Sequence, residues 1–286
     1  MEKWMVKRPC SKLLRISCRD ETGLVHKITG VLYRGGCNIV SNHEFVEPGT
    51  GAFFMRTGFE GGSELAELRR EMVAALPAGA SIDLTASGSR RIVAMVTREP
   101  HCLGELLLRA AHKDLPAKIV GVVGSRPDLQ GLSESFGVPF YLASTTDCSH
   151  AEHEADVRRL LGEIAPDYVV LAKYMRILSP QFVADHAGRI INIHHSFLPA
   201  FTGARPYQQA YERGVKIIGA TAHFVTSELD AGPIIAQDVQ HVDHRFTARK
   251  MAAAGRDVEK MVLAKALRWV LEDRVFVSGN KTVVFD

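Results

Sequence analysis

Ile191-Asn192-Ile193-His194 begins the segment, extending to Pro233, around which the fold and the candidate chemistry are built. Successive side chains of a β-strand face opposite sides, so Asn192 and His194 share one face of the predicted strand. Asp230 lies in Leu229-Asp230-Ala231-Gly232-Pro233, whose Gly and Pro predict a loop. An amide, an imidazole and a carboxylate could serve as oxyanion donor, proton-transfer group and anionic partner.

Strands and helices alternate around this segment, from Arg91 onward. Apolar runs predict strands, and amphipathic runs between them predict helices. The strands are expected at Ile92–Val96, Ala117–Val123, Gly137–Leu142, Tyr168–Ala172 and Ile190–His194, and the helices at Leu103–His112 and Ala151–Ile164. This alternation predicts an α/β fold with a doubly wound, mostly parallel, Rossmann-like sheet.

Two segments are expected at the carboxyl ends of these strands, the edge at which such sheets bind ligands. One is the end of the strand that carries Asn192 and His194, and the other is the loop from Lys173 to Pro180. A helix at Asp257–Asp273 and a hairpin at Val275–Phe285 are expected to end the chain. The sequence therefore predicts a ligand site near this loop and the Asn192 strand.

The first part of the chain has a different order of elements. Strands are expected at Leu13–Cys18, Cys37–Val40, Ala52–Thr57 and Ile82–Leu84, with helices at Leu24–Arg34 and Leu65–Leu76. The order βαββαβ is typical of a ferredoxin-like module. Ala86-Ser87-Gly88-Ser89 marks the boundary, so we divide the chain into domains at residues 1–86 and 87–286.

Composition excludes several classes of protein. The 286 residues are 46% hydrophobic and 23% charged, and the net charge of +3 is too small and too dispersed for nucleic-acid binding. The five cysteines are far apart, which argues against a disulfide framework. Neither a signal peptide nor a membrane span is visible. We therefore expect a cytoplasmic protein with no membrane and no nucleic-acid partner.

The N-terminal module resembles the ACT domain family. The resemblance lies in Asp20-Glu21-Thr22-Gly23-Leu24-Val25, which matches the turn that opens the family's first helix, and in Gly35-Gly36-Cys37-Asn38-Ile39, which matches the start of its second strand. It implies side-by-side pairing, hence a homo-oligomer (dimer or tetramer), and a possible amino-acid effector. Dimerisation is the favoured role.

The C-terminal part, roughly residues 90–270, resembles the folate-dependent formyltransferase family. Five ordered motifs carry the resemblance: Asn192-Ile193-His194, Ser196-Phe197-Leu198-Pro199, His223-Phe224-Val225, Glu228-Leu229-Asp230-Ala231-Gly232-Pro233 and the folate loop Met175-Arg176-Ile177-Leu178. It implies a one-carbon folate as substrate, with no cofactor apart from this folate.

Two departures from the family pattern narrow the expected reaction. Thr97-Arg98-Glu99-Pro100 stands where transferases acting on a phosphorylated acceptor have a glycine-rich phosphate loop; Pro100 removes an N–H donor and Glu99 would repel phosphate. His195 replaces the usual proline after the first motif. Together with the N-terminal module, these features are similar to the branch of the family that uses water as formyl acceptor. The resemblance implies hydrolysis of 10-formyltetrahydrofolate to tetrahydrofolate and formate, which balances one-carbon folate pools and supplies formate for purine synthesis.

The resemblance also assigns the candidate site residues. Asn192, His194 and Asp230 are the catalytic candidates, with Asn192 donating to the oxyanion and Asp230 orienting or deprotonating the water. The substrate-binding candidates are Met175, Arg176, Ile177, Leu178, His223, Val225 and Arg205. For Arg205, a contact with the glutamate tail of folate and a simple salt bridge are equally open. His241-Val242-Asp243-His244 has metal-ligand residue types without further ligands, so we expect no metal.

Two alternatives to hydrolysis stay open from the sequence. One is formyl transfer to another acceptor, a small amine or a charged initiator tRNA. The other is a non-catalytic sensor that holds folate in one domain and an amino acid in the other. The presence of Asn192, His194 and Asp230 argues against a sensor, because a binding protein has no need of all three.

Overall fold

The computed structural model describes residues 12–86, 88–199 and 206–286. The chain forms two compact units, one from residues 1–88 with 283–286 and the other from residues 89–282. Among the described residues, no helix is both long and apolar enough to cross a membrane.

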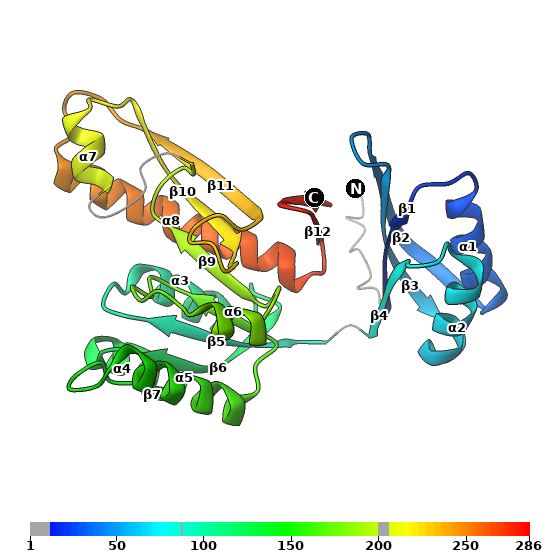
Figure 1. The fold of residues 1–286 in the computed structure, drawn as a ribbon, viewed down its shortest axis with the longest axis horizontal. Coiled ribbons are helices and arrows are strands. Elements are labelled where there is room, and N and C mark those ends of the chain that lie inside the picture. Colours follow the sequence, from blue (N-terminus) through cyan, green and yellow to red (C-terminus); the bar gives the residue numbers. More distant parts are fainter. Residues whose placement is uncertain (1–11, 87, 200–205) are drawn as a thin grey trace, which may run out of the picture. The chain divides into compact units, whose positions relative to one another are not determined.

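The first unit has the predicted ferredoxin-like order. Its elements are β1 (Lys12–Arg19), α1 (Leu24–Arg34), β2 (Cys37–Glu47), β3 (Ala52–Gly61), α2 (Leu65–Ala75) and β4 (Ser81–Ala86). The strands form an antiparallel sheet in the order β2-β3-β1-β4 (Figure 1). Apolar side chains from α1 and α2, among them Ile28 and Met72, pack against Leu14, Met55 and Phe59 of the sheet.

The second unit is built on a large α/β sheet. Its strands are β5 (Arg90–Val96), β6 (Ala117–Gly124), β7 (Phe140–Leu142), β8 (Tyr168–Leu171), β9 (Ile190–His194), β10 (Ile217–Phe224) and β11 (Ile234–His241). They form a seven-stranded sheet in the order β11-β10-β9-β8-β5-β6-β7. Strands β5 to β9 are parallel, and β10 runs antiparallel to both of its neighbours. The predicted doubly wound, mostly parallel sheet is confirmed.

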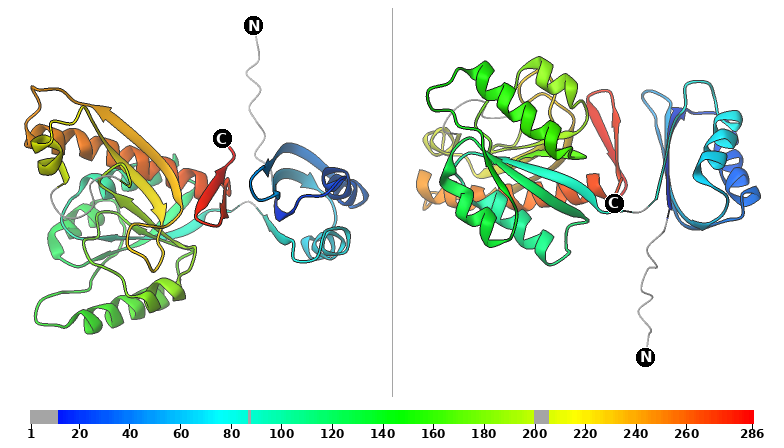
Figure 2. Two further views of the ribbon diagram at one scale, coloured as in Figure 1. Left: turned by 45° about the horizontal axis from the view of Figure 1, so that its top comes forward. Right: turned by 90° about the horizontal axis from the view of Figure 1, so that it is seen from below.

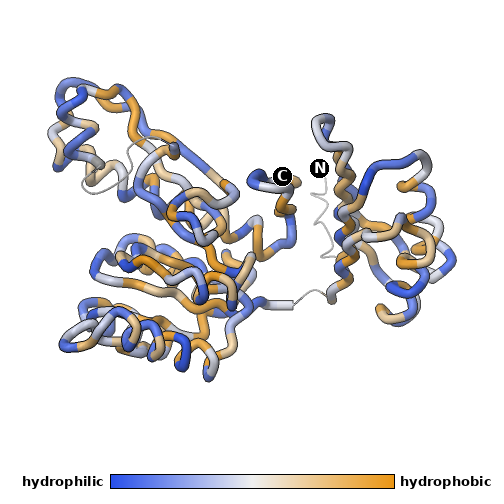
Figure 3. The backbone as a smooth tube through the Cα atoms, in the orientation of Figure 1, coloured by the Kyte–Doolittle hydropathy of each residue, from blue (hydrophilic) through white to orange (hydrophobic). Residues whose placement is uncertain are grey.

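Helices cover both faces of this sheet. They are α3 (His101–Ala111), α4 (Gln130–Ser135), α5 (His150–Ile164), α6 (Pro180–Asp185), α7 (Pro206–Glu212) and α8 (Ala248–Leu271), with a short 3-10 turn at Pro127–Leu129. Figure 2 shows α5 and α8 on opposite sides of the sheet. The helix tubes alternate between blue and orange in Figure 3, as expected for helices with one apolar side. Val157 and Leu161 of α5 and Phe182 of α6 pack against Val93 and Met95 of β5.

The end of the chain differs from the prediction at one boundary. Helix α8 begins at Ala248, whereas the sequence predicted a start at Asp257. Thr247 caps the helix by accepting a hydrogen bond from the Lys250 N–H. Gly255 lies inside the helix because the Tyr207 ring packs against its Cα, and a Cβ there would be 2.0 Å from the Tyr207 hydroxyl. The predicted hairpin is confirmed as β12 (Val275–Ser278) and β13 (Lys281–Val284).

The strand order reverses between β5 and β8, which makes the carboxyl ends of these two strands the switch point of the sheet. Thr97 follows β5 there, and its hydroxyl oxygen accepts a hydrogen bond from the N–H of Met175, 3.0 Å away, in the loop after β8. Strand β9 lies next to β8, so the Asn192 strand adjoins this loop.

Candidate active site

Pairing of β9 with β10 brings three polar side chains together. Asn192 lies directly opposite His223, and His194 lies opposite Thr221. Residues two apart on a strand share a face, so the side chains of Asn192 and His194 point the same way. The β10–β11 pairing has an irregularity at Ala222/His223, a feature often found beside active sites.

Asp230 joins this group from the loop between β10 and β11. Its Oδ2 is 3.2 Å from His194 Nδ1, and its Oδ1 is 3.7 Å from His223 Nε2. The Asp230 backbone adopts a left-handed conformation with φ 55°, which is uncommon outside glycine. Gly232 lets the loop pass against the strand, because a Cβ at this position would be 1.9 Å from the Phe224 carbonyl oxygen. The four predicted residues Asn192, His194, His223 and Asp230 thus form one cluster.

The Asp230 carboxylate is held in its charged form. The hydrogen bond with His194, and then the nearby His223 ring, lower the pKa of Asp230 well below its ordinary value of 3.8, although partial burial opposes this shift. Since the carboxylate can only accept, Nδ1 of His194 carries the hydrogen. The other nitrogen, His194 Nε2, is buried and has no hydrogen-bond partner among the described residues. Its lone pair is therefore not used by the described part of the protein.

The hydrogen bonds of His223 orient Asn192. Nδ1 of His223 lies 2.9 Å from the carbonyl oxygen of Phe224, so it donates. Nε2 of the neutral ring then accepts from the Asn192 amide nitrogen, 3.2 Å away. The amide carries two hydrogens, so the second remains for another acceptor. The arrangement presents an N–H donor and an imidazole lone pair at one site, which suits attack on a carbonyl-type carbon.

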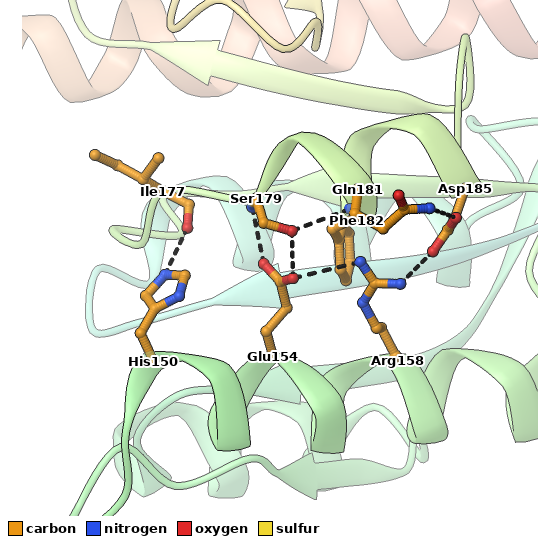
Figure 4. A network of polar contacts seen from close by, with 8 residues as sticks. All are labelled: His150, Glu154, Arg158, Ile177, Ser179, Gln181, Phe182 and Asp185. Atoms are coloured by element: carbon orange, nitrogen blue, oxygen red, sulfur yellow. Dashed lines mark hydrogen bonds and ion pairs between the residues drawn. The ribbon is translucent and has the colours of Figure 1, made fainter.

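Helix α5 holds the predicted folate loop in place (Figure 4). Glu154 accepts hydrogen bonds from the N–H and the hydroxyl of Ser179, and Arg158 pairs with both Glu154 and Asp185. His150 Nε2 lies 2.9 Å from the carbonyl oxygen of Ile177. Burial would raise the pKa of Glu154, but the bonds from Ser179 and Arg158 lower it, so this anchor stays charged. The start and the end of the loop are therefore both tied to the sheet or to α5.

The side chains within this loop divide into an exposed pair, Met175 and Ile177, and a partly buried pair, Leu178 and Arg176. Met175 and Ile177 are 60% and 65% exposed, so both side chains are available to a ligand. Leu178 packs partly against the core cluster under α5. Arg176 is half-buried and lines a small cavity with His150 and Glu154.

Two other predicted contacts are Val225 and Arg205. Val225 packs partly against the same core as Leu178, and its N–H bonds to the carbonyl oxygen of Ile190 at 2.9 Å. The structure thus gives the Val225 side chain a packing role, and a contact with substrate stays a prediction. Arg205 lies outside the described residues.

A second polar cluster, missed by the sequence reasoning, lies in the same unit. It consists of Lys173, Glu259, His101 and Tyr207. One signal was available: Glu259 occupies the buried stripe of α8 with Gly255 and Leu263, four residues to either side. A charged residue at such a position requires partners.

Side chains of metal-ligand type are engaged with the protein itself. His101, Cys102 and Glu259 lie close enough to share an ion, but Lys173 Nζ is 3.2 Å from Glu259 Oε2 and supplies the positive charge. Burial raises the pKa of the Cys102 thiol far above its ordinary value, so it stays protonated. In the His241–His244 segment, Arg245 bonds to Asp243 and lowers the pKa of that carboxyl to about 2.

Comparison with known proteins defines the class. Residues 90–267 match the family model described as Formyl transferase. Fold and site therefore place the second unit in the formyl transferase family.

Relatives that match over nearly the whole chain define the family more closely. Formyltetrahydrofolate deformylase of Escherichia coli O6:H1 is 54% identical over 96% of this chain and 98% of its own. That of Haemophilus influenzae is 50% identical over the same shares. The crystal structure of a formyltetrahydrofolate deformylase from Pseudomonas syringae pv. tomato has a TM-score of 0.92 at 43% identity, covering 96% of this chain and 94% of that one. The chain belongs to the formyltetrahydrofolate deformylases.

Proposed function

We propose that the protein hydrolyses 10-formyltetrahydrofolate to tetrahydrofolate and formate. Family membership supports the substrate and the reaction. The observation that carries the mechanism is the contact between His194 Nδ1 and the Asp230 carboxylate, which leaves the lone pair of His194 Nε2 unused by the described residues. No cofactor is needed, because the folate itself carries the formyl group.

The Asp230 carboxylate and the His194 imidazole suit different roles. A carboxylate with a strongly lowered pKa is a poor proton acceptor, so Asp230 orients His194 and stabilises the charge that develops on its ring. His194 Nε2 takes the proton as the water oxygen bonds to the formyl carbon. The Asn192 amide donates to the resulting oxyanion, an interaction whose loss typically raises the barrier by about 2.7–4 kcal/mol.

Collapse of this intermediate completes the reaction. The bond between the formyl carbon and the amine nitrogen of the folate breaks, and the nitrogen receives the proton from His194. Tetrahydrofolate and formate are released, and His194 returns to its neutral form. The pterin of the substrate lies along the loop that displays Met175 and Ile177, whose exposed side chains support this placement.

Turnover without an acceptor tests the proposal. Purified protein and 10-formyltetrahydrofolate are combined with no amine added, and both tetrahydrofolate and formate are quantified. Steady, equimolar release of the two products is expected. Binding of the folate without formate release would instead favour transfer to an amine acceptor, or a sensor of folate and amino acids.

We further propose that the first unit pairs with a second copy and binds an amino-acid effector. Its ferredoxin-like order supports this role, as does the edge strand β2, where Val40, Phe45 and Val46 are exposed. Sedimentation and rate measurements across the common amino acids test it. Unchanged mass and unchanged rate for every amino acid would contradict the regulatory part. We place the reaction in the cytoplasm, where the formate would supply purine synthesis.

A further inference from the structure

A buried ion pair lies beside His195. Lys173, two residues after β8, and Glu259 of α8 are 6% and 1% exposed, and Lys173 Nζ is 3.2 Å from Glu259 Oε2. His101 Nε2 is 2.7 Å from the same oxygen, and the Tyr207 hydroxyl donates to the other at 2.6 Å. Burial would raise the pKa of Glu259, but His101, Lys173 and Tyr207 lower it to about 2. The carboxylate therefore stays charged beside the ammonium.

His195 connects this ion pair to the active site. Lys173 Nζ is 3.5 Å from His195 Nδ1. The His195 ring stacks on that of His194, with 4.8 Å between centroids and 18° between planes. An ammonium group can donate but not accept, so Nδ1 of His195 must present its lone pair, and the ring hydrogen resides on Nε2. Protonation of Nδ1 would direct an N–H at the ammonium, so Lys173 disfavours the charged form of His195.

The charge on His195 matters because His194 takes up a proton in the proposed reaction. Two stacked imidazolium rings would repel each other, whereas a neutral ring beside an imidazolium does not. Among the described residues, Lys173 lies at Nδ1 of His195 and His194 stacks on its ring, while Glu259 and His101 lie beyond Lys173.

We propose that Lys173 is a positioning residue that holds His195 neutral and in a single tautomer, so that His194 can accept the proton of the attacking water. This inference rests on the proposed hydrolysis and names a further residue for it.

Two observations argue that Lys173 does more than fill space. Its backbone is left-handed, with φ 64°, a conformation that favours glycine and is strained for lysine. A buried ion pair is also weak evidence for stability by itself, since apolar replacements are often neutral. A strained, buried lysine beside the ring that stacks on His194 is better explained by what its ammonium does to that ring.

Nitrogen-15 NMR of histidine-labelled protein reads the His195 tautomer without any substrate. In the wild type, we expect an unprotonated Nδ1, a protonated Nε2 and no protonation of the ring as the pH is lowered to the limit of the folded state. In Lys173→Met, we expect a mixture of tautomers and an observable titration. The ring signals of His195 are assigned as those that disappear from the spectrum of His195→Phe. A His195 ring that is charged in the wild type, or unaltered in Lys173→Met, would overturn the inference.

Kinetics provides the second readout. Lys173→Met should lower kcat by about 10- to 100-fold, as small misplacements of catalytic groups do, with KM nearly unchanged. The acid limb of the kcat profile should move to higher pH, because His195 then protonates beside His194. His195→Phe keeps an uncharged ring in the stack. The double variant His195→Phe/Lys173→Met should therefore have the same pH profile of kcat as His195→Phe alone. An equal shift in both backgrounds would contradict the role assigned to His195.

Controls separate this role from general damage to the cluster. Tyr207→Phe removes one hydrogen bond from Glu259 and leaves Lys173 in place, so it should keep the wild-type profile. If Lys173→Met folds poorly, Lys173→Met/Glu259→Gln removes both charges and leaves no unpaired carboxylate. It should show the same NMR and kinetic changes. If the wild type hydrolyses the substrate and the Lys173 variants show unchanged kinetics and NMR spectra, the inference is refuted and the proposed hydrolysis is not.

Discussion

Asp230 is the residue on which the proposed chemistry depends most directly. Its left-handed backbone and the missing side chain of Gly232 place the carboxylate against His194. Strained backbone of this kind concentrates at functional sites, where the surrounding structure holds it in place.

Replacement of Asp230 tests its role. Asp230→Asn keeps the shape but loses the charge and can turn an N–H towards His194, which favours the wrong tautomer. We expect kcat to fall by about 10⁴-fold, as in the analogous change in serine proteases. Folate affinity, measured by equilibrium titration, and the unfolding midpoint should change little. Near-normal turnover of the variant would remove Asp230 from the mechanism.

The pH profile of the wild type gives a second residue-level prediction. The pKa of Asp230 lies below its ordinary value of 3.8, so its carboxylate remains charged as the pH falls from 7 to 5. Any loss of kcat/KM in this interval therefore comes from another group. Asp230→Asn should therefore stay well below the wild type in kcat/KM at every pH in this range. A variant that matched the wild type at pH 5 would show that Asp230 titrates there.

Sequence order indicated the candidate catalytic residues but not the groups that contact them. Asn192, His194 and Asp230 lie in ordered motifs, and strand periodicity placed the first two on one face. Lys173 and Glu259 are far apart in sequence and meet only when α8 packs against the sheet. Their pairing could not be predicted from the local sequence pattern. A glutamate on the buried stripe of α8 did indicate that a charged or polar partner had to lie beside it.

At the scale of elements, α5 fixes the loop along which we propose that the pterin lies. Glu154 of α5 bonds to Ser179 at the end of this loop, whereas Glu163, on the same helix, pairs only with Arg159 at the surface among the described contacts. The two carboxylates are a matched pair for experiment.

We expect Glu154→Ala to raise KM more than it lowers kcat, because the freed loop positions the pterin poorly. Losing hydrogen bonds to a charged group should also lower the free energy of unfolding by about 1.5–3 kcal/mol. Glu163→Ala should change it by less than about 1 kcal/mol, since exposed ion pairs contribute little. Steady-state kinetics and urea denaturation measure both effects. Equal KM values for the two variants would contradict the role of α5.

Two helical glycines provide a prediction about packing. Alanine normally stabilises a helix relative to glycine by about 0.5–1 kcal/mol. Gly104→Ala in α3 should show this gain, because nothing lies within 4 Å of its added Cβ. Gly255→Ala in α8 should destabilise instead, because its Cβ would overlap the Tyr207 ring. Thermal unfolding distinguishes them, and stabilisation by Gly255→Ala would show that Tyr207 moves freely.

The same glycine explains why one helix boundary could not be predicted. Gly255 interrupts the helical pattern in the sequence, yet Tyr207, some fifty positions earlier in the chain, fills the space over it. The doubly wound, mostly parallel sheet, by contrast, followed from the alternation of apolar strands with amphipathic helices. Local periodicity was sufficient for β5, β6, β8 and β9, whereas β10, β11, α4, α6 and α7 were not predicted from it.

At the scale of the whole molecule, the buried charge of Glu259 predicts how stability depends on pH. Its pKa falls from 4.5 to about 2 on folding. A carboxyl with a lowered folded-state pKa stabilises fully above about pH 4.5, and this contribution is lost as the pH falls towards 2. Glu259→Gln leaves Lys173 unpaired and should be less stable by about 3–5 kcal/mol at pH 7. Urea denaturation across this range should show the difference narrowing below pH 4.5; a constant difference would contradict the assignment.

The most direct test of the central claim is to run the reaction in water enriched in oxygen-18, with no amine acceptor, and to analyse the formate by mass spectrometry. If water attacks the formyl carbon in the Asn192–His194–Asp230 site, each formate from the wild type carries one labelled oxygen, and Asp230→Asn yields none above the enzyme-free blank. Unlabelled formate, or a formyl group found on another molecule in place of formate, would contradict the account.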